Sequence, residues 1–257
     1  MDDAAPDLPP GFTLIALDSV DSTNEEAKRR ARDGAEDGTI VWAREQTAGR
    51  GRRDRAWASP RGNLYCSVVT RPDCPLEQAA QLGFAACLGV GGALGSLVPP
   101  LTELRYKWPN DVLLNGRKVS GILLETASRP DGGLDWLVVG VGINVASCPR
   151  DTAFPATSLA DTGAGAVEAA TVLEAFCRQF LTWVNRWLDE GFPPLRQAWL
   201  VRAKGVGAPI EVRLGDGSTL EGVFEGLDEG GALLLKTADG VRSIDHGDVF
   251  FAAAADR

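Results

Sequence analysis

The stretch Gln46–Tyr65 reads QTAGRGRRDRAWASPRGNLY and carries the strongest signal in the chain. Four of the seven residues 49–55 are arginine and two are glycine. Guanidinium groups bind phosphate and carboxylate oxygens in a planar, bidentate way, and glycine lets a backbone approach a ligand closely. Trp57 adds an aromatic plane that can lie against a nucleobase. Alone, the stretch fits equally well a loop that folds over an anionic ligand and a solvated basic loop that contacts nucleic acid.

The chain as a whole is acidic, which limits its partners. Twenty-six basic and thirty-five acidic residues give a formal net charge of −9, which argues against a general polyanion binder. No apolar run is long enough to span a membrane, and the acidic, proline-rich residues 1–12 read as a loose leader. Five scattered cysteines and one histidine, His246, fit neither the common zinc sites nor a disulfide framework. We therefore expect a cytoplasmic protein with reduced thiols and no metal site of its own.

Strand and helix signals lie on both sides of the arginine-rich stretch. Strands are expected at residues 12–17, 39–45, 63–70, 103–108, 111–114, 117–125 and 135–145. Helical periodicity predicts helices at residues 22–34, 75–98, 167–188 and 194–203. Thr23 with Glu26, or Ser22 with Glu25, matches a capping box, so spacing alone favours a structural role for both hydroxyls. Asn115-Gly116 predicts a tight hairpin.

The composition changes at residue 204. Beyond it the chain has no helical period, and five short strand-like runs alternate with the turns GDG, DEGG and ADG. That turn spacing predicts a small β-barrel or SH3-like module. We therefore divide the chain into residues 1–204 and 205–257.

Three further segments share the character of the arginine-rich stretch. They are KWPND at 107–111, GRKVSG at 116–121 and GVGIN at 140–144. Each is weak alone, because a lysine beside a turn is usually solvated and glycines in strands are often packing devices. In this order, and with DSTNEEAK at 21–28 before them, the segments resemble the biotin protein ligases over roughly residues 12–251.

The resemblance implies a fold and an activity. The fold class is α+β: a mixed β-sheet backed by helices, with an SH3-like β-barrel at the C-terminus. The activity is ATP-dependent activation of biotin as biotinyl-5′-AMP, followed by transfer to a lysine of a biotin carboxyl carrier domain, as in acetyl-CoA carboxylase. Biotin and ATP are the implied substrates, Mg²⁺ enters with ATP, and the protein is a monomer or a homodimer.

The resemblance also implies site residues. The implied catalytic residues are Arg52 and Lys118. They can neutralise the biotin carboxylate and the α-phosphate of ATP, the two anions that must be brought together. The biotin-binding positions are Ser22, Thr23, Asn24, Gln46, Gly49, Arg50, Arg52, Lys118 and Gly121. The ATP and adenylate positions are Arg52, Arg53, Arg55, Trp57, Asn110, Asp111, Lys118 and Asn144. Because four close arginines repel one another, we expect residues 49–61 to order only around bound anions.

Two departures and two alternatives complete the prediction. Asp54 stands where most members of the family have glycine, and no helix-turn-helix domain precedes Asp18. The second departure predicts an enzyme without operator binding. A lipoate–protein ligase is the nearest chemical alternative, although the arginine-rich and KWPND motifs belong to the biotin branch. A nucleic-acid-binding module is the alternative of a different class, and the net charge of −9 speaks against it.

Overall fold

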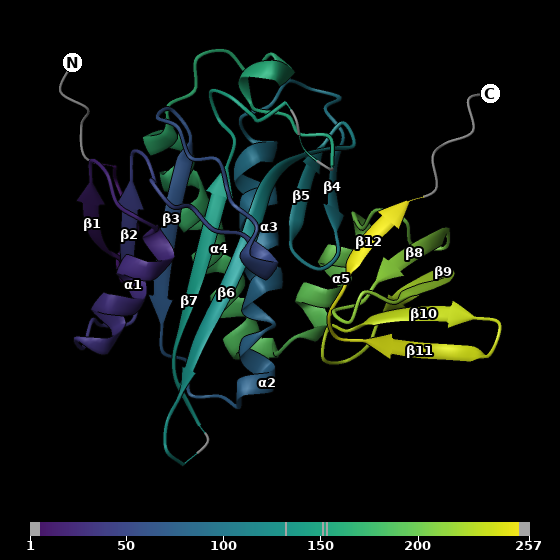
Figure 1. The fold of residues 1–257 in the computed structure, drawn as a ribbon. Helices are drawn as coiled ribbons and strands as arrows, with labels where there is room; N and C mark the ends of the chain where they lie inside the picture. Colours follow the sequence, from purple (N-terminus) through teal and green to yellow (C-terminus); the bar gives the residue numbers. More distant parts are fainter. Residues whose placement is uncertain (1–5, 132, 151, 153, 252–257) are drawn as a thin grey trace.

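The computed structural model describes residues 6–131, 133–150, 152 and 154–251. Its main body is a seven-stranded sheet in the order β1-β2-β3-β7-β6-β5-β4 (Figure 1). The strands are β1 (Thr13–Leu17), β2 (Thr39–Ala43), β3 (Leu64–Thr70), β4 (Leu104–Lys107), β5 (Asp111–Leu114), β6 (Arg117–Ser128) and β7 (Leu134–Ile143). β1 pairs with β2 in parallel and the other neighbours are antiparallel, so the predicted mixed sheet is confirmed, with the apolar run of β7 at its centre.

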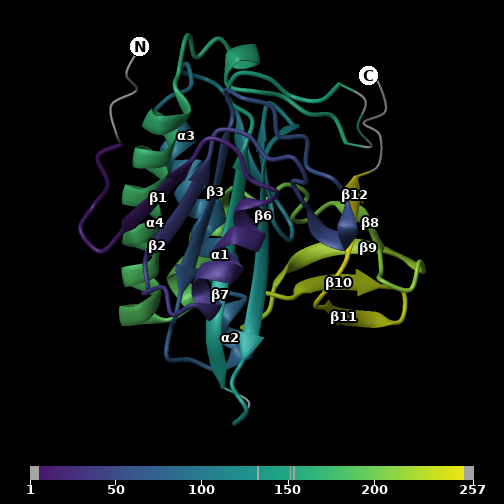
Figure 2. The same cartoon turned by 60° about the vertical axis from the view of Figure 1, so that its left-hand side comes forward.

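Helices cover both faces of this sheet (Figure 2). They are α1 (Thr23–Arg32), α2 (Leu76–Ala79), α3 (Leu82–Gly95), α4 (Ala169–Glu190) and α5 (Pro193–Val201). Alternate strand residues face opposite ways, so Val41 packs towards α1 while its neighbours Ile40 and Trp42 join the large core under α3 and α4. The helix expected at 75–98 is two helices, because the backbone at residues 80–81 makes three-residue turns such as Gly83 N–H to Ala80 O.

The C-terminal module is an antiparallel five-stranded sheet in the order β11-β10-β9-β8-β12. Its strands are β8 (Pro209–Arg213), β9 (Thr219–Leu227), β10 (Leu233–Thr237), β11 (Gly240–Ile244) and β12 (Asp248–Phe251). The predicted α+β class with a small β module is thus confirmed. The module is docked tightly: the Trp108 indole donates to Gly231 O at 3.1 Å, and Arg196 donates to Leu227 O. Consequently β12 stands beside the ends of β4 and β5.

Three local predictions, for a hairpin, a helix cap and the N-terminal segment, can be compared with the structure. The Asn115-Gly116 hairpin forms as predicted, with φ of 49° and 75° at its two turn residues. The capping-box prediction is wrong: Ser22 caps α1 without a side-chain hydrogen bond, and the Glu26 carboxylate binds Arg29 and Arg30. The leader is not loose throughout, because Leu8 packs against the core and Asp7 N–H donates to Glu174, while residues 1–5 lie outside the described part.

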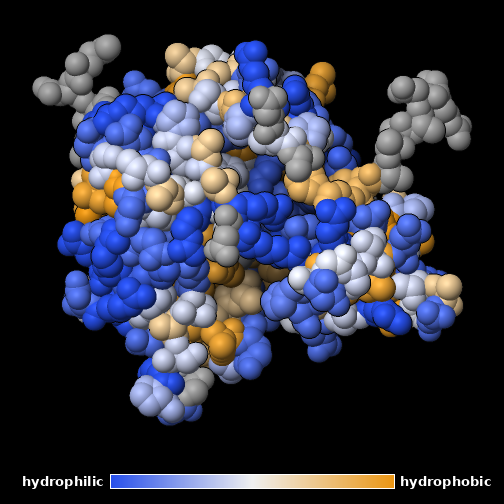
Figure 3. Space-filling model, in the orientation of Figure 1, coloured by the Kyte–Doolittle hydropathy of each residue, from blue (hydrophilic) through white to orange (hydrophobic). Residues whose placement is uncertain are grey.

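The visible surface is largely polar (Figure 3), and the cysteines are unpaired. Hydrophilic residues dominate the face seen in Figure 3, and the hydrophobic ones form small scattered patches. The five cysteines are all free, and three of them, Cys66, Cys87 and Cys177, are buried. In the part of the chain that the structure describes, no helix has the length and apolarity needed to cross a bilayer.

Candidate active site

A cavity of about 680 Å³ lies between the large sheet, the loop at 46–61 and β12. All but one of the predicted site residues line it: Ser22, Thr23, Asn24, Gln46, Gly49, Arg50, Arg52, Arg55, Trp57, Asn110, Asp111, Lys118, Gly121 and Asn144. They come from α1, β5, β6, the end of β7 and three loops. The fold therefore brings together segments that are up to 122 positions apart in the chain, from Ser22 to Asn144.

One end of the cavity is lined mainly by neutral polar side chains, which hydrogen bonds join to one another. The Thr23 N–H and hydroxyl both donate to Gln46 Oε1, at 2.8 and 3.1 Å, and Gln46 Nε2 donates to Ser59 Oγ at 2.8 Å. Behind them, Ser67 Oγ donates to Asn24 Oδ1 at 2.6 Å and lies 2.8 Å from Thr23 Oγ1. We call Thr23, Asn24, Gln46, Ser59 and Ser67 the neutral end. Spacing suggested a cap for Thr23, but a partner 23 residues away holds it in the cavity wall.

Glycines in β6 and β7 make room for this wall. A Cβ on Gly142 would lie 2.7 Å from the Trp57 ring, and a Cβ on Gly121 would lie 3.2 Å from it. A Cβ on Gly140 would overlap the Asn24 amide. The glycines of the 140–144 segment are therefore there for close approach, because the Trp57 ring and the Asn24 side chain lie directly on the strands.

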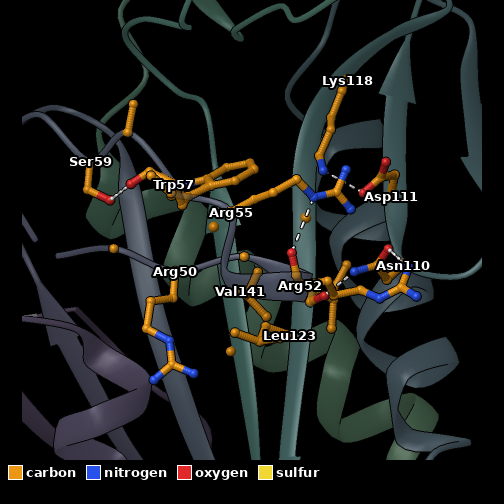
Figure 4. A pocket seen from close by; sticks show the side chains of 18 of the residues that line it. Arg50, Arg52, Arg55, Trp57, Ser59, Asn110, Asp111, Lys118, Leu123 and Val141 are labelled. Carbon is orange, nitrogen blue, oxygen red and sulfur yellow. Dashed lines mark hydrogen bonds and ion pairs between the residues drawn. The ribbon is translucent and has the colours of Figure 1, made fainter. Parts of the chain in front are cut away.

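The other end of the cavity is crowded with charge (Figure 4). Lys118 Nζ lies 2.6 Å from Asp111 Oδ1 and 5.2 Å from the Trp57 ring centroid. Arg52 donates to Gly247 O at 3.2 Å and to Asn110 Oδ1 at 3.4 Å. Lys107 lies in the same wall, and Asp248 reaches it from β12. We call Arg52, Lys107, Asp111, Lys118 and Asp248 the charged end.

Asp248 forms ion pairs with three arginines of the loop. Its carboxylate lies 3.7 Å from Arg52, 3.1 Å from Arg53 and 3.1 Å from Arg55. Burial lowers the pKa of Arg52, and the nearby Asp248 charge acts in the opposite direction. The counter-charge that we expected only from ligands is thus partly supplied by the C-terminal module.

Arg53 is the predicted site residue that the structure places elsewhere. It adopts a positive φ of 55° and does not line the cavity, and its guanidinium binds Asp248, which does. In this structure its side chain holds the loop to β12, and its assignment to ATP stays a prediction. The Asp54 side chain lies outside the described residues.

Arg50 points away from the charged end in Figure 4. Its guanidinium binds Glu25 on α1 and lies 3.3 Å from Glu125 on β6, and Lys28 bridges the same two carboxylates at 2.7 Å each. Burial acts to raise the pKa of Glu125, but hydrogen bonds from Lys28 and Asn24 leave it below its usual value. Acidic side chains of the protein therefore hold the arginine-rich part of the loop from two sides.

Several cavity residues escaped the sequence prediction, chiefly Ser59, Lys107, Gly140, Gly142, Phe154 and Asp248. Lys107 and the two glycines lie within motifs that had been noticed, so a signal existed. Asp248 gave none, because in the sequence it is an ordinary residue beginning a short strand. Among the described residues, no three His, Cys, Asp or Glu side chains gather as a metal site.

Comparisons with known proteins agree over nearly the whole chain. Residues 8–201 match the Biotin/lipoate A/B protein ligase family, and residues 206–252 match the Biotin protein ligase C terminal domain. A biotin–[acetyl-CoA-carboxylase] ligase from Paracoccus denitrificans is 42% identical over 240 residues, which cover 91% of this chain and 99% of the relative.

Solved structures give the same picture. A biotin protein ligase from Aquifex aeolicus in complex with biotin and ATP is similar with a TM-score of 0.78 and 31% identity, covering 93% of this chain and 97% of that chain. A biotin protein ligase from Leishmania major in complex with biotinyl-5-AMP has a TM-score of 0.56 and 26% identity, covering 95% of this chain and all of that chain, 100%.

Proposed function

The chain belongs to the biotin protein ligase family, and on that premise we propose that this cavity joins biotin to ATP and passes the biotinyl group to a carrier lysine. The chain acts as a biotin–[acetyl-CoA-carboxylase] ligase through biotinyl-5′-AMP. The observation that carries the assignment of residues is one cavity with a neutral end and a charged end. Biotin offers a neutral ureido ring and an anionic carboxylate, so it matches that polarity.

Biotin occupies the neutral end in this proposal. The ureido group has one acceptor oxygen and two N–H donors, which hydroxyl and amide side chains can satisfy. Its carboxylate then extends past Trp57 towards Lys118. The biotin-binding residues that we propose are Ser22, Thr23, Asn24, Gln46, Gly49, Arg50, Arg52, Lys118 and Gly121.

ATP occupies the charged end. The ATP and adenylate residues that we propose are Arg52, Arg55, Trp57, Asn110, Asp111, Lys118 and Asn144. Trp57 presents a ring face for adenine. Hard cations such as Mg²⁺ take several oxygen ligands. The Asn110 and Asp111 side chains supply only two groups, and Asp111 is already paired with Lys118. We therefore propose that Mg²⁺ enters with ATP.

Adenylation joins two anions. A biotin carboxylate oxygen bonds to the α-phosphorus while the bond from that phosphorus to the bridging oxygen breaks, and pyrophosphate leaves with the electron pair. Lys118 and Arg52 neutralise the charge that gathers on the α-phosphate, and they are already oriented by Asp111 and Asn110. The loop at 49–61 keeps water from the mixed anhydride.

Transfer completes the reaction. A neutral lysine amine of a biotin carboxyl carrier domain attacks the acyl carbon, an amide forms, and AMP leaves with the electron pair of the broken bond. The amine loses its proton to solvent. We place the reaction in the cytoplasm, where ATP and reduced thiols are available, with the protein as a monomer or homodimer.

The test is a labelling assay with purified protein, biotin, ATP and a carrier domain. We expect one lysine of the carrier to gain one biotin, as read by intact-mass and peptide mass spectrometry, and no labelling of a carrier whose target lysine is replaced by arginine. Lipoate in place of biotin is the control for the other branch of the family. Labelling by lipoate and not by biotin would contradict the proposal. The match of residues 206–252 to a C-terminal domain of biotin ligases favours biotin.

We also propose that the chain binds no duplex DNA. Its net charge is −9, and the loop arginines are occupied by Glu25, Glu125 and Asp248. Fluorescence anisotropy with mixed duplexes at physiological salt should show no tight binding. Tight binding with a steep salt dependence, as several phosphate contacts produce, would contradict it.

The division into a catalytic domain at 1–204 and an SH3-like domain at 205–257 remains our proposal. It is supported by the two sheets, which share no strand. Because β12 lines the cavity, the smaller domain takes part in the site.

A further inference from the structure

Lys107 is a buried cation in the cavity wall that the reaction described above does not use. It is the last residue of β4 and only 6% of its surface is exposed. It stands opposite Asp111 of β5, and Asp111 in turn stands opposite Gly121 of β6. The cavity wall beside the Trp57 ring therefore consists of Gly121 on β6, then Asp111 on β5, and then Lys107 on β4.

The Lys107 ammonium faces aromatic rings instead of carboxylates. Its Nζ lies 3.5 Å from the centroid of Phe154, 5.8 Å from that of Phe250 and 5.9 Å from that of Phe251. Among the described residues it makes no ion pair and no side-chain hydrogen bond. The nearest carboxylates are engaged elsewhere, Asp111 with Lys118 and Asp248 with the loop arginines.

Such a group is costly to bury. An ammonium has three donors, and contact with a ring face offsets only part of its lost hydration. Burial lowers the pKa of Lys107 to about 8, while Asp111 acts to raise it and Lys118 to lower it. An anion delivered to this corner of the cavity would supply the missing partner.

We propose that Lys107 forms a pyrophosphate subsite, which holds the β- and γ-phosphates of ATP before adenylation and pyrophosphate after it. This inference rests on the proposed function. Lys118 and Arg52 flank the α-phosphate, so the phosphates beyond it extend past Asp111 to the next strand, where Lys107 stands. As the bond between the α-phosphorus and the bridging oxygen breaks, that oxygen gains charge, and the Lys107 ammonium donates a hydrogen bond to the departing pyrophosphate. The ammonium keeps its proton throughout.

Phe154 shapes the subsite. Its ring fixes the ammonium at one side of the cavity and packs 5.1 Å from the Phe250 ring, centroid to centroid. A strongly hydrated carboxylate in its place would neutralise Lys107 and oppose phosphate binding. The aromatic contact orients the lysine and leaves its charge available.

The test separates pyrophosphate from the rest of the reaction. Lys107→Gln keeps length and polarity and removes the charge. Lys204→Gln is the matched control, because Lys204 Nζ also lies over an aromatic ring of this cluster, 4.6 Å from Phe251, but does not line the cavity. Three quantities are measured: calorimetric affinity for pyrophosphate, the KM for ATP in adenylate formation, and the rate of transfer from synthetic biotinyl-5′-AMP to the carrier.

We expect Lys107→Gln to weaken pyrophosphate binding and raise the KM for ATP by about tenfold or more, as for loss of a charge-assisted hydrogen bond. Transfer from the preformed adenylate should stay near wild type, and Lys204→Gln should leave all three quantities unchanged. Unchanged pyrophosphate affinity in Lys107→Gln overturns the proposal, and so does an equal loss of adenylation and transfer, which indicates a structural role.

Two further readouts keep the outcomes apart. If the wild-type protein neither forms nor transfers the adenylate, the proposed function fails, whereas calorimetry still reports on the pyrophosphate subsite. If Lys107→Gln does not fold, amine labelling of the wild-type protein replaces it. Pyrophosphate should then protect Lys107 but not Lys204 from reductive methylation, as read by peptide mass spectrometry. Equal labelling of Lys107 with and without pyrophosphate overturns the subsite.

Discussion

At the neutral end of the cavity Thr23, Gln46 and Ser59 bind one another, whereas at the charged end three cations crowd around two carboxylates. Thr23 and Ser59 are buried, Gln46 is half-buried, and all three are already hydrogen-bonded, so they are held in place before any ligand arrives. At the charged end Lys107 has no anionic partner among the described residues, and Asp248 is shared among three arginines. The neutral end is thus preorganised for recognition, and the charged end keeps the Lys107 cation available to bind phosphate.

The largest effect should come from the charged end. Lys118→Ala removes the cation closest to Asp111 and Trp57, and adenylate formation should slow by about 10²–10³-fold, the scale of a lost transition-state donor. Biotin-dependent exchange of labelled pyrophosphate into ATP measures this step. The control is Lys236→Ala, an exposed lysine paired with Glu225 far from the cavity. A near wild-type exchange rate in Lys118→Ala would show that the charged end does not act on the α-phosphate.

A second prediction concerns Gly142, which lies against the Trp57 ring between the two ends of the cavity. Gly142→Ala places a Cβ 2.7 Å from the Trp57 ring, which must shift. Overpacking of this kind costs about 1–3 kcal/mol, so the KM for ATP should rise by roughly one to two orders of magnitude. Gly95→Ala is the control, since a Cβ there meets nothing within 4 Å. Equal kinetics for the two variants would mean that the Trp57 position is unimportant for ATP.

At the neutral end the effect should be smaller and limited to biotin. Thr23→Val removes a hydroxyl that donates to Gln46 and lies 2.8 Å from Ser67 Oγ. We expect the KM for biotin to rise about tenfold, the result of leaving one buried polar partner unsatisfied at about 1–2 kcal/mol, while the KM for ATP is unchanged. The control is Thr39→Val, a buried threonine on β2 that binds Glu36 O outside the cavity. A rise in both KM values would contradict the division between the ends.

The smallest effect should appear in the loop. Asp248→Asn removes the charge shared by Arg52, Arg53 and Arg55, and partly exposed ion pairs contribute only about 0–1 kcal/mol each. Trypsin should therefore cut after Arg53 or Arg55 a few times faster than in the wild type. Biotin with ATP should protect both proteins, and biotin alone only partly. Glu211→Gln, next to Arg213 on β8, is the control. Equal cleavage of all three proteins without ligand would mean that Asp248 does not hold the loop.

The contrast between the ends also explains what the sequence could predict. Of the charged end, Arg52, Asp111 and Lys118 lie within the arginine-rich, KWPND and GRKVSG motifs, so this part of it was visible as local patterns. Strand-like runs likewise predicted the strands, the Asn115-Gly116 pair predicted the hairpin, and the spacing of turns predicted the β module. The neutral end also depends on Ser59 and Ser67. Each is a single hydroxyl residue on a separate segment, so no sequence pattern predicts that they lie in the site.

Other features depended on tertiary structure alone. The capping box failed because the Thr23 hydroxyl donates to Gln46 and the Glu26 carboxylate binds Arg29 and Arg30. The pairing of Arg53 with Asp248 was not visible in the sequence either, because it depends on the positive φ of Arg53 and on the position of β12. Asp248 is nearly two hundred positions from the arginines it binds, so only the docking of the two sheets could identify it.

The most direct test of this account is a single-turnover experiment without any carrier protein. The chain is mixed with biotin and ATP labelled at the α- and γ-phosphates, so that the adenylate and the pyrophosphate are both labelled, and the products are separated after gel filtration. The account predicts that pyrophosphate is released and that biotinyl-5′-AMP remains bound to the protein, close to one per active chain, until a carrier domain is added. Release of free AMP without retained adenylate, or no pyrophosphate release with biotin present, would contradict the claim that this cavity forms and shelters the mixed anhydride.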